Sequence, residues 1–358
     1  MFSLSPSGGA PPSSTPAPTP IPLVPWYYDC RRVPNDTVDT VKGGVQHKQL
    51  VPIGHNEALF TYGLTDKEDR RRCTQHWCIM SLSQDGSLSS LPIDAPPGSS
   101  GIVNMQIVRV ADSVIAYGGY IQPQQFGLSH NVPSHAMFTY SIDTREWAEV
   151  VCEGEVPQPR LAPLVFPFKN SLVLMGGYMY PKEGERGTEP RKDMWQWCGE
   201  RERGAWTRIG EMPPGLKASG LVGVETQDAL LFCNYQVDGT VTYKYTPHNQ
   251  HWEGPLPLRH LSNGEMVEGQ KMYEPYRFCA LSDKKLLYMS KDRYKSNLRL
   301  WLYNTVAGEC VQCEGVPGLV AGSTATCLIN PTTLLILGDD KLNGRYRCKD
   351  TSWLVELD

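Results

Sequence analysis

Short apolar runs that end in small or turn-forming residues recur along the chain at a nearly constant spacing. The six runs are ALFTYGL (58–64), VIAYGGY (114–120), LVLMGGY (172–178), LLFCNY (230–235), LLYMS (286–290) and LLILGDD (334–340). Consecutive anchor residues lie 55, 58, 57, 56 and 49 positions apart, and the anchors are Gly63, Gly118, Gly176, Cys233, Met289 and Gly338. An apolar run of this length between turn residues is typical of a buried β-strand. The pattern therefore predicts six repeated units.

A pair of aromatic residues accompanies several of these runs. Tyr140 is followed seven positions later by Trp147, and Tyr245 is followed in the same way by Trp252. The third unit has Trp197 and Trp206, nine positions apart, and the pairs at the corresponding place in the fifth and first units are Tyr303 with Cys310 and Met80 with Ser87. Each unit then consists of strand, strand, glycine-rich turn, strand, turn and strand. We expect the aromatic residues to fill the space between adjacent sheets, because each offers a large apolar area.

Paired glycines end two of the runs, at Gly118–Gly119 and at Gly176–Gly177. Glycine permits a positive φ angle and a close approach of two backbones, which are both needed where strands crowd together. These glycines are therefore predicted to serve the architecture.

Taken together, the double glycine after an apolar strand, the Tyr–x6–Trp pair and the Pro–x–Pro–Arg turn at Pro157, Pro159 and Arg160 make the sequence resemble the kelch-repeat family. The resemblance is specific in the second and third units, moderate in the fourth, and rests on spacing alone in the others. The resemblance implies an all-β fold, a six-bladed β-propeller with four antiparallel strands in each blade.

The two ends of the chain are predicted to meet. Aligning WLVELD (353–358) on FTYSID (138–143) leaves the last unit without its fourth strand. We expect PLVPWYYD (22–29) to supply that strand, with Trp26 at the place of Trp147, because an open sheet edge favours aggregation. The predicted domains are a disordered Pro/Ser-rich tail at 1–21 and a propeller at 22–358. Within the tail, TPAPTPIP (15–22) is either inert or a ligand for a proline-recognising domain.

The composition of the chain reduces the number of function classes that fit it. A net charge of −4 and a pI near 6.1 provide no overall attraction to nucleic acid or to an anionic membrane. No apolar stretch reaches the roughly 20 residues of a membrane-spanning helix, and residues 1–25 lack the pattern of a signal peptide. Eleven cysteines, an odd number, favour reduced thiols and a cytoplasmic location. Cys310 and Cys313 have the spacing of metal ligands, but no second pair completes a site, so no metal or cofactor is expected.

Basic residues gather in the loops between the second and third strands of units one, five and six. These loops and the connections from each fourth strand to the next first strand share one face, where long loops commonly carry recognition. The predicted partner-binding residues are Arg70, Arg72, Lys291, Arg293, Tyr294, Arg345 and Tyr346. Arginines of this kind suit an acidic or phosphorylated peptide. The alternative is solvated loop charge, which neighbouring carboxylates partly cancel.

The residues give less support to a catalytic function than to a binding function. The eight histidines form no set for a copper radical site, and Glu189 and Asp193 begin a Glu–x3–Asp–x3–His iron motif that fails at Trp197. Neither GxxxxGK[ST] nor GxSxG occurs. A mutarotase-like enzyme that uses the central funnel for a sugar or other small molecule stays open as an alternative. The sequence does not single out acid and base groups for it, because Arg109 is followed by a strand end and no carboxylate takes an obvious inner-strand position.

The prediction for function is therefore a non-enzymatic interaction scaffold or effector that binds a protein or peptide partner. Many kelch proteins are substrate adaptors of ubiquitin ligases and carry a BTB, F-box or elongin-binding segment. We expect no such segment here, because the tail is short and rich in proline and Asp358 ends the last unit. A role as an adaptor acting with a separate subunit is the remaining alternative.

Overall fold

The computed structural model describes residues 28–33, 45–65, 73–122, 131–179, 188–216, 221–236, 239–262, 265–268, 274–282, 285–291, 298–313, 319–340 and 349–357. Within these ranges every regular element is a β-strand except for one short 3-10 turn, Pro247–Asn249. The predicted all-β class is thus confirmed.

Most of the described strands belong to six sheets that follow one another along the chain. Sheet 1 contains β2 (Val45–Gly54), β3 (Glu57–Thr65), β4 (Cys73–Leu82) and β5 (Leu88–Pro92). Sheet 2 contains β7 (Gln106–Val110), β8 (Ser113–Tyr117), β11 (Met137–Ser141) and β12 (Trp147–Glu149). Sheet 3 contains β14 (Leu164–Phe168), β15 (Ser171–Met175), β18 (Asp193–Gly199) and β19 (Arg203–Glu211).

The second half of the chain repeats this order. Sheet 4 contains β20 (Leu221–Glu225), β21 (Leu230–Gln236), β22 (Gly239–Thr246) and β23 (His251–Pro257). Sheet 5 contains β26 (Glu274–Ser282), β27 (Lys285–Lys291), β28 (Leu298–Asn304) and β29 (Glu309–Gln312). Sheet 6 contains β30 (Leu319–Asn330), β31 (Thr333–Asp340), β32 (Lys349–Leu357) and, from the other end of the chain, β1 (Tyr28–Val33).

The six apolar runs form the second strands of the six sheets, as predicted. In β3, Ala58, Leu59 and Phe60 are all fully buried, although their side chains alternate between the two faces of the sheet. A strand that is covered on both faces is apolar without interruption, which is why the runs stand out in the sequence.

Paired glycines follow two of these strands for the predicted reason. Gly118, Gly119, Gly176 and Gly177 all have φ angles between 65° and 82°. A Cβ atom on Gly119 would lie 2.6 Å from the carbonyl oxygen of Val103. Both the backbone conformation and the close approach therefore require glycine at this turn.

Aromatic pairs lie between adjacent sheets. Tyr140 and Trp147 face each other across β11 and β12, with ring centroids 5.0 Å apart. Trp147 also reaches Trp77 of sheet 1, with centroids 4.9 Å apart. In sheet 4, Tyr245 and Trp252 form the same pair, 4.7 Å apart, and in sheet 3 Trp197 pairs with Trp206. The architectural role predicted for these residues is confirmed.

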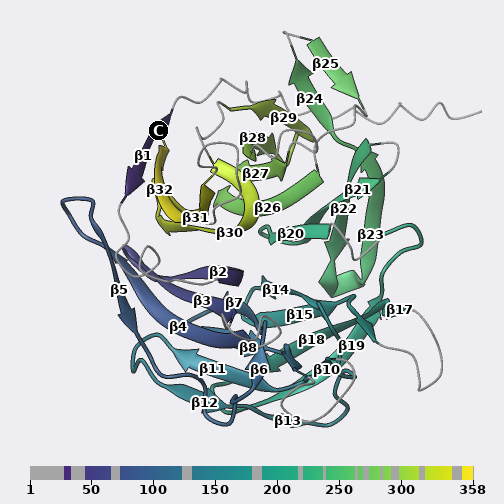
Figure 1. Ribbon diagram of the computed structural model, residues 1–358. Coiled ribbons are helices and arrows are strands. Elements are labelled where there is room, and N and C mark those ends of the chain that lie inside the picture. The colour runs from purple at the N-terminus through teal and green to yellow at the C-terminus, as the bar shows by residue number, and fades with distance from the viewer. Residues whose placement is uncertain are drawn as a thin grey trace, which may run out of the picture.

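Each sheet contributes its first strand to the middle of the molecule (Figure 1). These six strands are edge strands of their sheets, and each contacts the next in the order β2, β7, β14, β20, β26 and β30, after which β30 contacts β2. The series of contacts thus returns to its start.

The ends of the chain pair in sheet 6. β1 runs antiparallel to β32, with Tyr28 opposite Leu357 and Val33 opposite Ser352. The prediction that an N-terminal segment completes the last sheet therefore holds for these strands. The predicted position of Trp26 is wrong, because Cys30 is opposite Val355 and so takes the level that Trp147 has opposite Tyr140. Trp26 itself and the predicted tail at 1–21 lie outside the described residues.

Two sheets depart from the predicted four antiparallel strands. β13 (Val151–Glu153) continues the chain after β12 and pairs parallel with β19, which gives sheet 3 a fifth strand. β24 (Arg259–Ser262) pairs parallel with β29, and β25 (Glu265–Glu268) extends that edge, so sheet 5 has six strands. In each case the chain leaves one sheet by pairing with the outer strand of the next. The repeat pattern carries no signal for such parallel additions.

Short strands form two small sheets near the paired glycines. β6 (Ile102–Val103), β9 (Tyr120–Ile121) and β10 (Val132–Pro133) form a small sheet beside sheet 2. β16 (Tyr178–Met179) and β17 (Glu189–Pro190) form another beside sheet 3. β9, β10, β16 and β17 belong to connections between second and third strands, and β6 belongs to the connection from sheet 1 to sheet 2, so all five lie on the loop face of the molecule.

Candidate functional site

The predicted partner-binding residues fall almost entirely on segments that lie outside the described residues. These are Arg70, Arg72, Arg293, Tyr294, Arg345 and Tyr346. Lys291 is the last residue of β27, and the structure describes its backbone alone.

The strands that carry these loops are described. Loop 66–72 leaves sheet 1 at the paired residues Thr65 and Cys73, and loop 292–297 leaves sheet 5 at Lys291 and Leu298. Loop 341–348 leaves sheet 6 at Asp340 and Lys349. Since β26 contacts β30 and β30 contacts β2, sheets 5, 6 and 1 are consecutive neighbours. The predicted neighbourhood of the three units is thus present in their strands.

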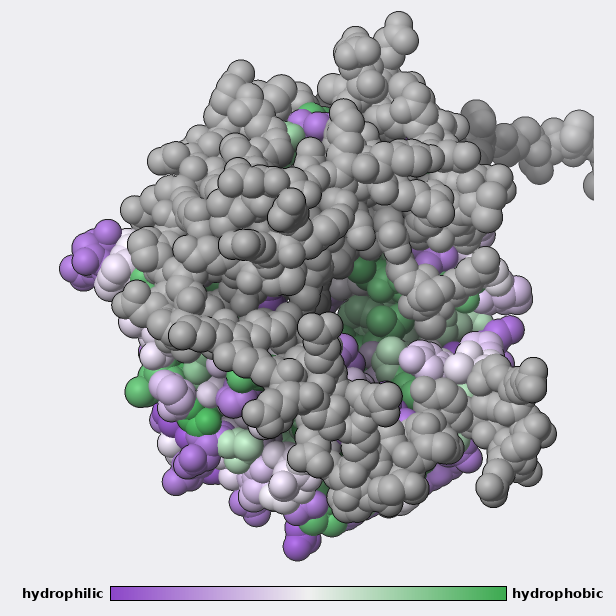
Figure 2. Space-filling model, viewed as in Figure 1, coloured by the Kyte–Doolittle hydropathy of each residue, from purple (hydrophilic) through white to green (hydrophobic). Residues whose placement is uncertain are grey.

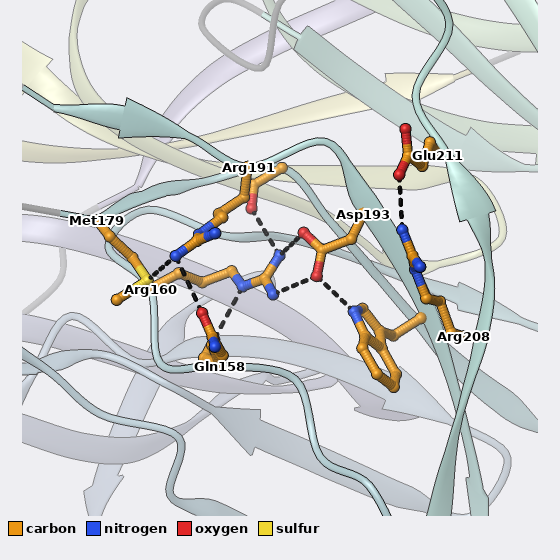
Figure 3. Close-up of polar contacts among 9 residues, drawn as sticks. Gln158, Arg160, Met179, Arg191, Asp193, Arg208 and Glu211 are labelled. Carbon is orange, nitrogen blue, oxygen red and sulfur yellow. Dashed lines mark hydrogen bonds and ion pairs between the residues drawn. The ribbon is translucent and has the colours of Figure 1, made fainter. Parts of the chain in front are cut away.

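Sheet 3 contributes a buried arginine to the same face, at the Pro–x–Pro–Arg turn (Figure 3). The Arg160 side chain is 1% exposed and donates from both terminal nitrogens to the carboxylate of Asp193, each over 2.8 Å. Its Nη1 also donates to the carbonyl oxygen of Gly176 and its Nε to that of Gln158. Arg160 therefore ties the turn before β14 to the glycine turn after β15 and to the start of β18.

The partner of this arginine is held ionised. Burial raises the pKa of the Asp193 carboxyl, but hydrogen bonds from Arg160 and from the indole nitrogen of Trp195 outweigh burial and leave the pKa below its ordinary value. Asp193 is the second residue of the incomplete iron motif, and its oxygens accept hydrogen bonds from Arg160 and Trp195. Its role in the structure is to hold Arg160.

A second arginine lies beside this pair without a carboxylate. Arg191 stands immediately before β18, and its Nη2 donates to Oε1 of Gln158 over 3.0 Å and contacts the sulfur of Met179. Its Nε is buried and meets no acceptor. In Figure 3, dashed lines join both Arg191 and Arg160 to Gln158, and of these two arginines Arg160 alone meets Asp193.

Further along the face, sheets 1 and 2 place histidine and tyrosine side by side. Nε2 of His47 lies 3.5 Å from the hydroxyl of Tyr120, the residue that follows the first glycine pair. The ring of Tyr62 stacks on that of His76 with centroids 5.3 Å apart. Burial lowers the pKa of both histidines, which favours their uncharged form at neutral pH. This part of the face is aromatic and carries hydrogen-bonding groups with little charge.

The middle of the molecule holds a cavity of about 860 Å³. Its lining comes from the first strands of all six sheets, chiefly from aliphatic residues such as Leu50, Val108 and Leu221. Figure 2 shows a hollow with hydrophobic walls near the centre of the view, where Figure 1 places β20. Ligand pockets commonly have volumes of about 300 to 1,000 Å³, so the cavity is large enough for a small molecule or a side chain of a partner.

Two ionisable residues, Arg109 and Glu225, are part of the cavity lining. Arg109 donates from Nε to the carbonyl oxygen of Ala111 and from Nη1 to that of Pro52. Glu225 accepts a hydrogen bond from the backbone of Lys169. Both residues lie at the ends of first strands, so they belong to the end of the cavity away from the loop face.

Neither a protein-family model nor a curated protein matches the sequence. Solved structures share its fold. The structure of YjhT has a TM-score of 0.56 at 12% identity and covers 90% of this chain and 100% of its own. For a protein of unknown function from Dyadobacter fermentans DSM 18053 the TM-score is 0.58 at 9% identity, with 92% and 98% covered. For RAG in complex with one melted and one unmelted RSS it is 0.56 at 13% identity, with 92% and 99% covered. At such identities the likeness shows a β-rich fold alone, and membership of the kelch family stays a prediction.

The described residues form neither a cluster that could hold a metal ion nor a helix that could cross a membrane. Within them, no three histidine, cysteine or acidic side chains gather in a way that could hold a metal ion. The same part of the chain contains no helix with the length and apolarity needed to cross a membrane. The eight cysteines whose side chains are described, Cys310 and Cys313 among them, are free thiols.

Three residues of interest escaped the sequence analysis. Arg191 lies next to a loop rich in charged residues, and nothing in the sequence separates it from its neighbours. Tyr120 could have been found, because it directly follows a glycine pair that ends a buried strand. Glu225 ends a first strand, as Arg109 nearly does, but its place in the cavity depends on the circular order of the sheets.

Proposed function

We propose that this chain is a six-bladed kelch-type β-propeller that works as a non-enzymatic interaction protein. Its ligand is an acidic or phosphorylated segment of a partner protein. The segment binds on the face that carries the loops between second and third strands.

The propeller is supported by the arrangement of the sheets. Their first strands contact one another in a series that returns to its start, and the chain's two ends share sheet 6. Such closure removes the free edges that an open row of sheets would expose.

The ligand assignment is carried by the charge of three loop sequences whose anchoring strands belong to neighbouring sheets. Residues 66–72, 292–297 and 341–348 together contain nine basic and four acidic residues, while the whole chain has a net charge of −4. Their anchoring strands belong to three consecutive sheets. A local positive field on an acidic protein favours an anionic partner.

Reversing two of these charges tests the assignment. We expect the double variant Arg293→Glu/Arg345→Glu to bind pools of acidic and phosphoserine peptides at least tenfold more weakly than the wild-type chain, because each change replaces attraction by repulsion. Fluorescence polarisation at 50 and 150 mM salt would measure the affinities, and the loss should shrink at the higher salt. Arg208→Glu is the matched control, since Arg208 lies on outer strand β19, where it pairs with Glu211 and is 53% exposed. Unchanged binding by the double variant would rule out this ligand.

The cavity favours a second candidate function, a mutarotase-like enzyme that acts on a sugar or another small molecule. Its volume and the presence of Arg109 and Glu225 support this alternative. A monosaccharide that raises the melting temperature of the wild-type chain but not of an Arg109→Met variant would favour it over the binding function.

The cellular setting is part of the proposal. The free thiols support work in a reducing compartment such as the cytoplasm. There the protein acts as a scaffold or effector. A ubiquitin-ligase adaptor acting through a separate subunit would use the same peptide-binding face.

A further inference from the structure

Arg191 is a partly buried arginine whose described partners are neutral, as are those of the exposed Arg109. Arg145, Arg160, Arg201, Arg208 and Arg259 each meet a carboxylate, on Glu57, Asp193, Glu146, Glu211 and Glu309 respectively. Arg191 is bound by the neutral groups of Gln158 and Met179, and within the described part of the chain it has no ion pair.

The position of Arg191 is fixed by its surroundings. Its backbone nitrogen donates to the carbonyl oxygen of Gly177 over 2.9 Å, in the glycine turn that Arg160 also braces. Its guanidinium is partly buried and is held by Gln158, which comes from the connection between sheets 2 and 3. The cation is therefore ordered before any ligand arrives, so little side-chain entropy remains to be lost on binding.

The arrangement of Arg191 and Gln158 favours the binding of an anion. A guanidinium that is partly removed from water and has no counter-ion among the described residues gains from an anionic oxygen more than a fully solvated one does. The amide of Gln158 accepts from Arg191 through Oε1, which leaves its Nε2 as a second donor on an exposed side chain. One carboxylate or phosphoryl group can bind both donors.

We propose that Arg191, supported by Gln158, is the recognition residue for an anionic side chain of the partner peptide. The inference rests on the proposed function and adds a contact on sheet 3, apart from the basic loops of sheets 5, 6 and 1. Arg160 is the positioning residue, because it holds the turn from which Gln158 projects.

The test compares three peptide pools that differ at one position. The pools are acetylated heptapeptides with a central glutamate, phosphoserine or glutamine, and fluorescence polarisation measures their binding. We expect Arg191→Gln to weaken binding of the glutamate and phosphoserine pools at least tenfold and to leave the glutamine pool unchanged. Arg191→Lys keeps the charge but loses the planar fork, so its loss should be smaller for both anionic pools. Comparing the glutamate and phosphoserine losses identifies which anion the site prefers.

Controls separate recognition from folding. Arg208→Gln removes an exposed arginine from the outer strand of the same sheet and should change no affinity. Since Arg191 has few partners, the melting temperatures of both Arg191 variants should stay within about 2 °C of the wild-type value. A variant that binds the glutamine pool as poorly as the acidic pools has lost structure, and that result would count against a recognition role.

The outcomes distinguish this inference from the proposed function. If Arg191→Gln binds the anionic pools as the wild-type chain does, while Arg293→Glu/Arg345→Glu has lost them, the inference is wrong and the basic-loop site stands. If the wild-type chain binds no anionic pool better than the glutamine pool, both proposals are overturned.

Discussion

Deleting residues 1–33, which removes β1, is expected to lower the melting temperature by roughly 5 °C or more. β1 forms a six-residue antiparallel ladder with β32, and hydrogen bonds of this kind contribute about 0.5 to 1.5 kcal/mol each. The deletion also leaves an unpaired edge on β32, where Leu354 and Val355 are fully buried. Calorimetry measures the change.

A shorter deletion is the matched control for the loss of β1. Removing residues 1–27 leaves every residue of β1 in place, so the melting temperature should stay within about 1 °C of the wild-type value. Equal melting temperatures for the two deletions would show that β1 does not complete sheet 6. Aggregation of the longer deletion is the expected companion of its free edge.

Replacing Arg160 by methionine should cost about 3 to 5 kcal/mol in the free energy of unfolding. The change keeps most of the side-chain volume but leaves the Asp193 carboxylate and the carbonyl oxygens of Gln158 and Gly176 without their donor. Unsatisfied buried acceptors and an unpaired buried charge are among the most destabilising changes in a protein. Urea denaturation gives the value.

Two further variants serve as controls for the effect of Arg160→Met on stability. Arg208→Met breaks the exposed ion pair with Glu211 and should cost no more than about 1 kcal/mol. The double variant Arg160→Met/Asp193→Leu removes the charge together with its partner and should recover part of the stability. If Arg160→Met is as stable as Arg208→Met, Arg160 does not organise the turns around the glycine pair.

Much of the fold could be predicted because its strongest signals are local. A second strand is covered on both faces, so Leu59 and its neighbours form a continuous apolar run. The glycine pair at Gly118 and Gly119 is required by positive φ angles, and Tyr140 lies directly opposite Trp147. Burial of the strand, the positive φ angles and the aromatic pair each involve residues that are close in sequence.

Features that depend on distant parts of the chain escaped prediction. Arg160 and Asp193 are 33 residues apart, and no periodicity joins them. The choice of Trp26 followed the aromatic pattern, whereas the strand register puts Cys30 at that level. The parallel pairing of β13 with β19 joins one repeat to the next.

The candidate site, like the fold, has features that could be predicted from the sequence and features that could not. The sequence identified the basic loops, whereas the cavity residues Arg109 and Glu225 emerged from the structure. The sequence could not single out Arg191, because the partners of this residue among the described residues depend on three-dimensional contacts, such as the one with Gln158, 33 positions away. Local charge patterns therefore indicate a face, and the structure places on it an arginine that has no carboxylate partner among the described residues.

The account depends on the meeting of the chain's two ends, since this closure makes the three basic units neighbours. A disulfide between β1 and β32 tests it most directly. Cys30 lies opposite Val355, and paired residues of antiparallel strands have Cα atoms about 4.5 to 5.5 Å apart, within the range of a disulfide. We predict that mild oxidation of the Val355→Cys variant links position 355 to Cys30, as detected by peptide mass spectrometry, whereas the adjacent Glu356→Cys variant forms no such link. Absence of the link in Val355→Cys, or equal linkage in both variants, would contradict the closure.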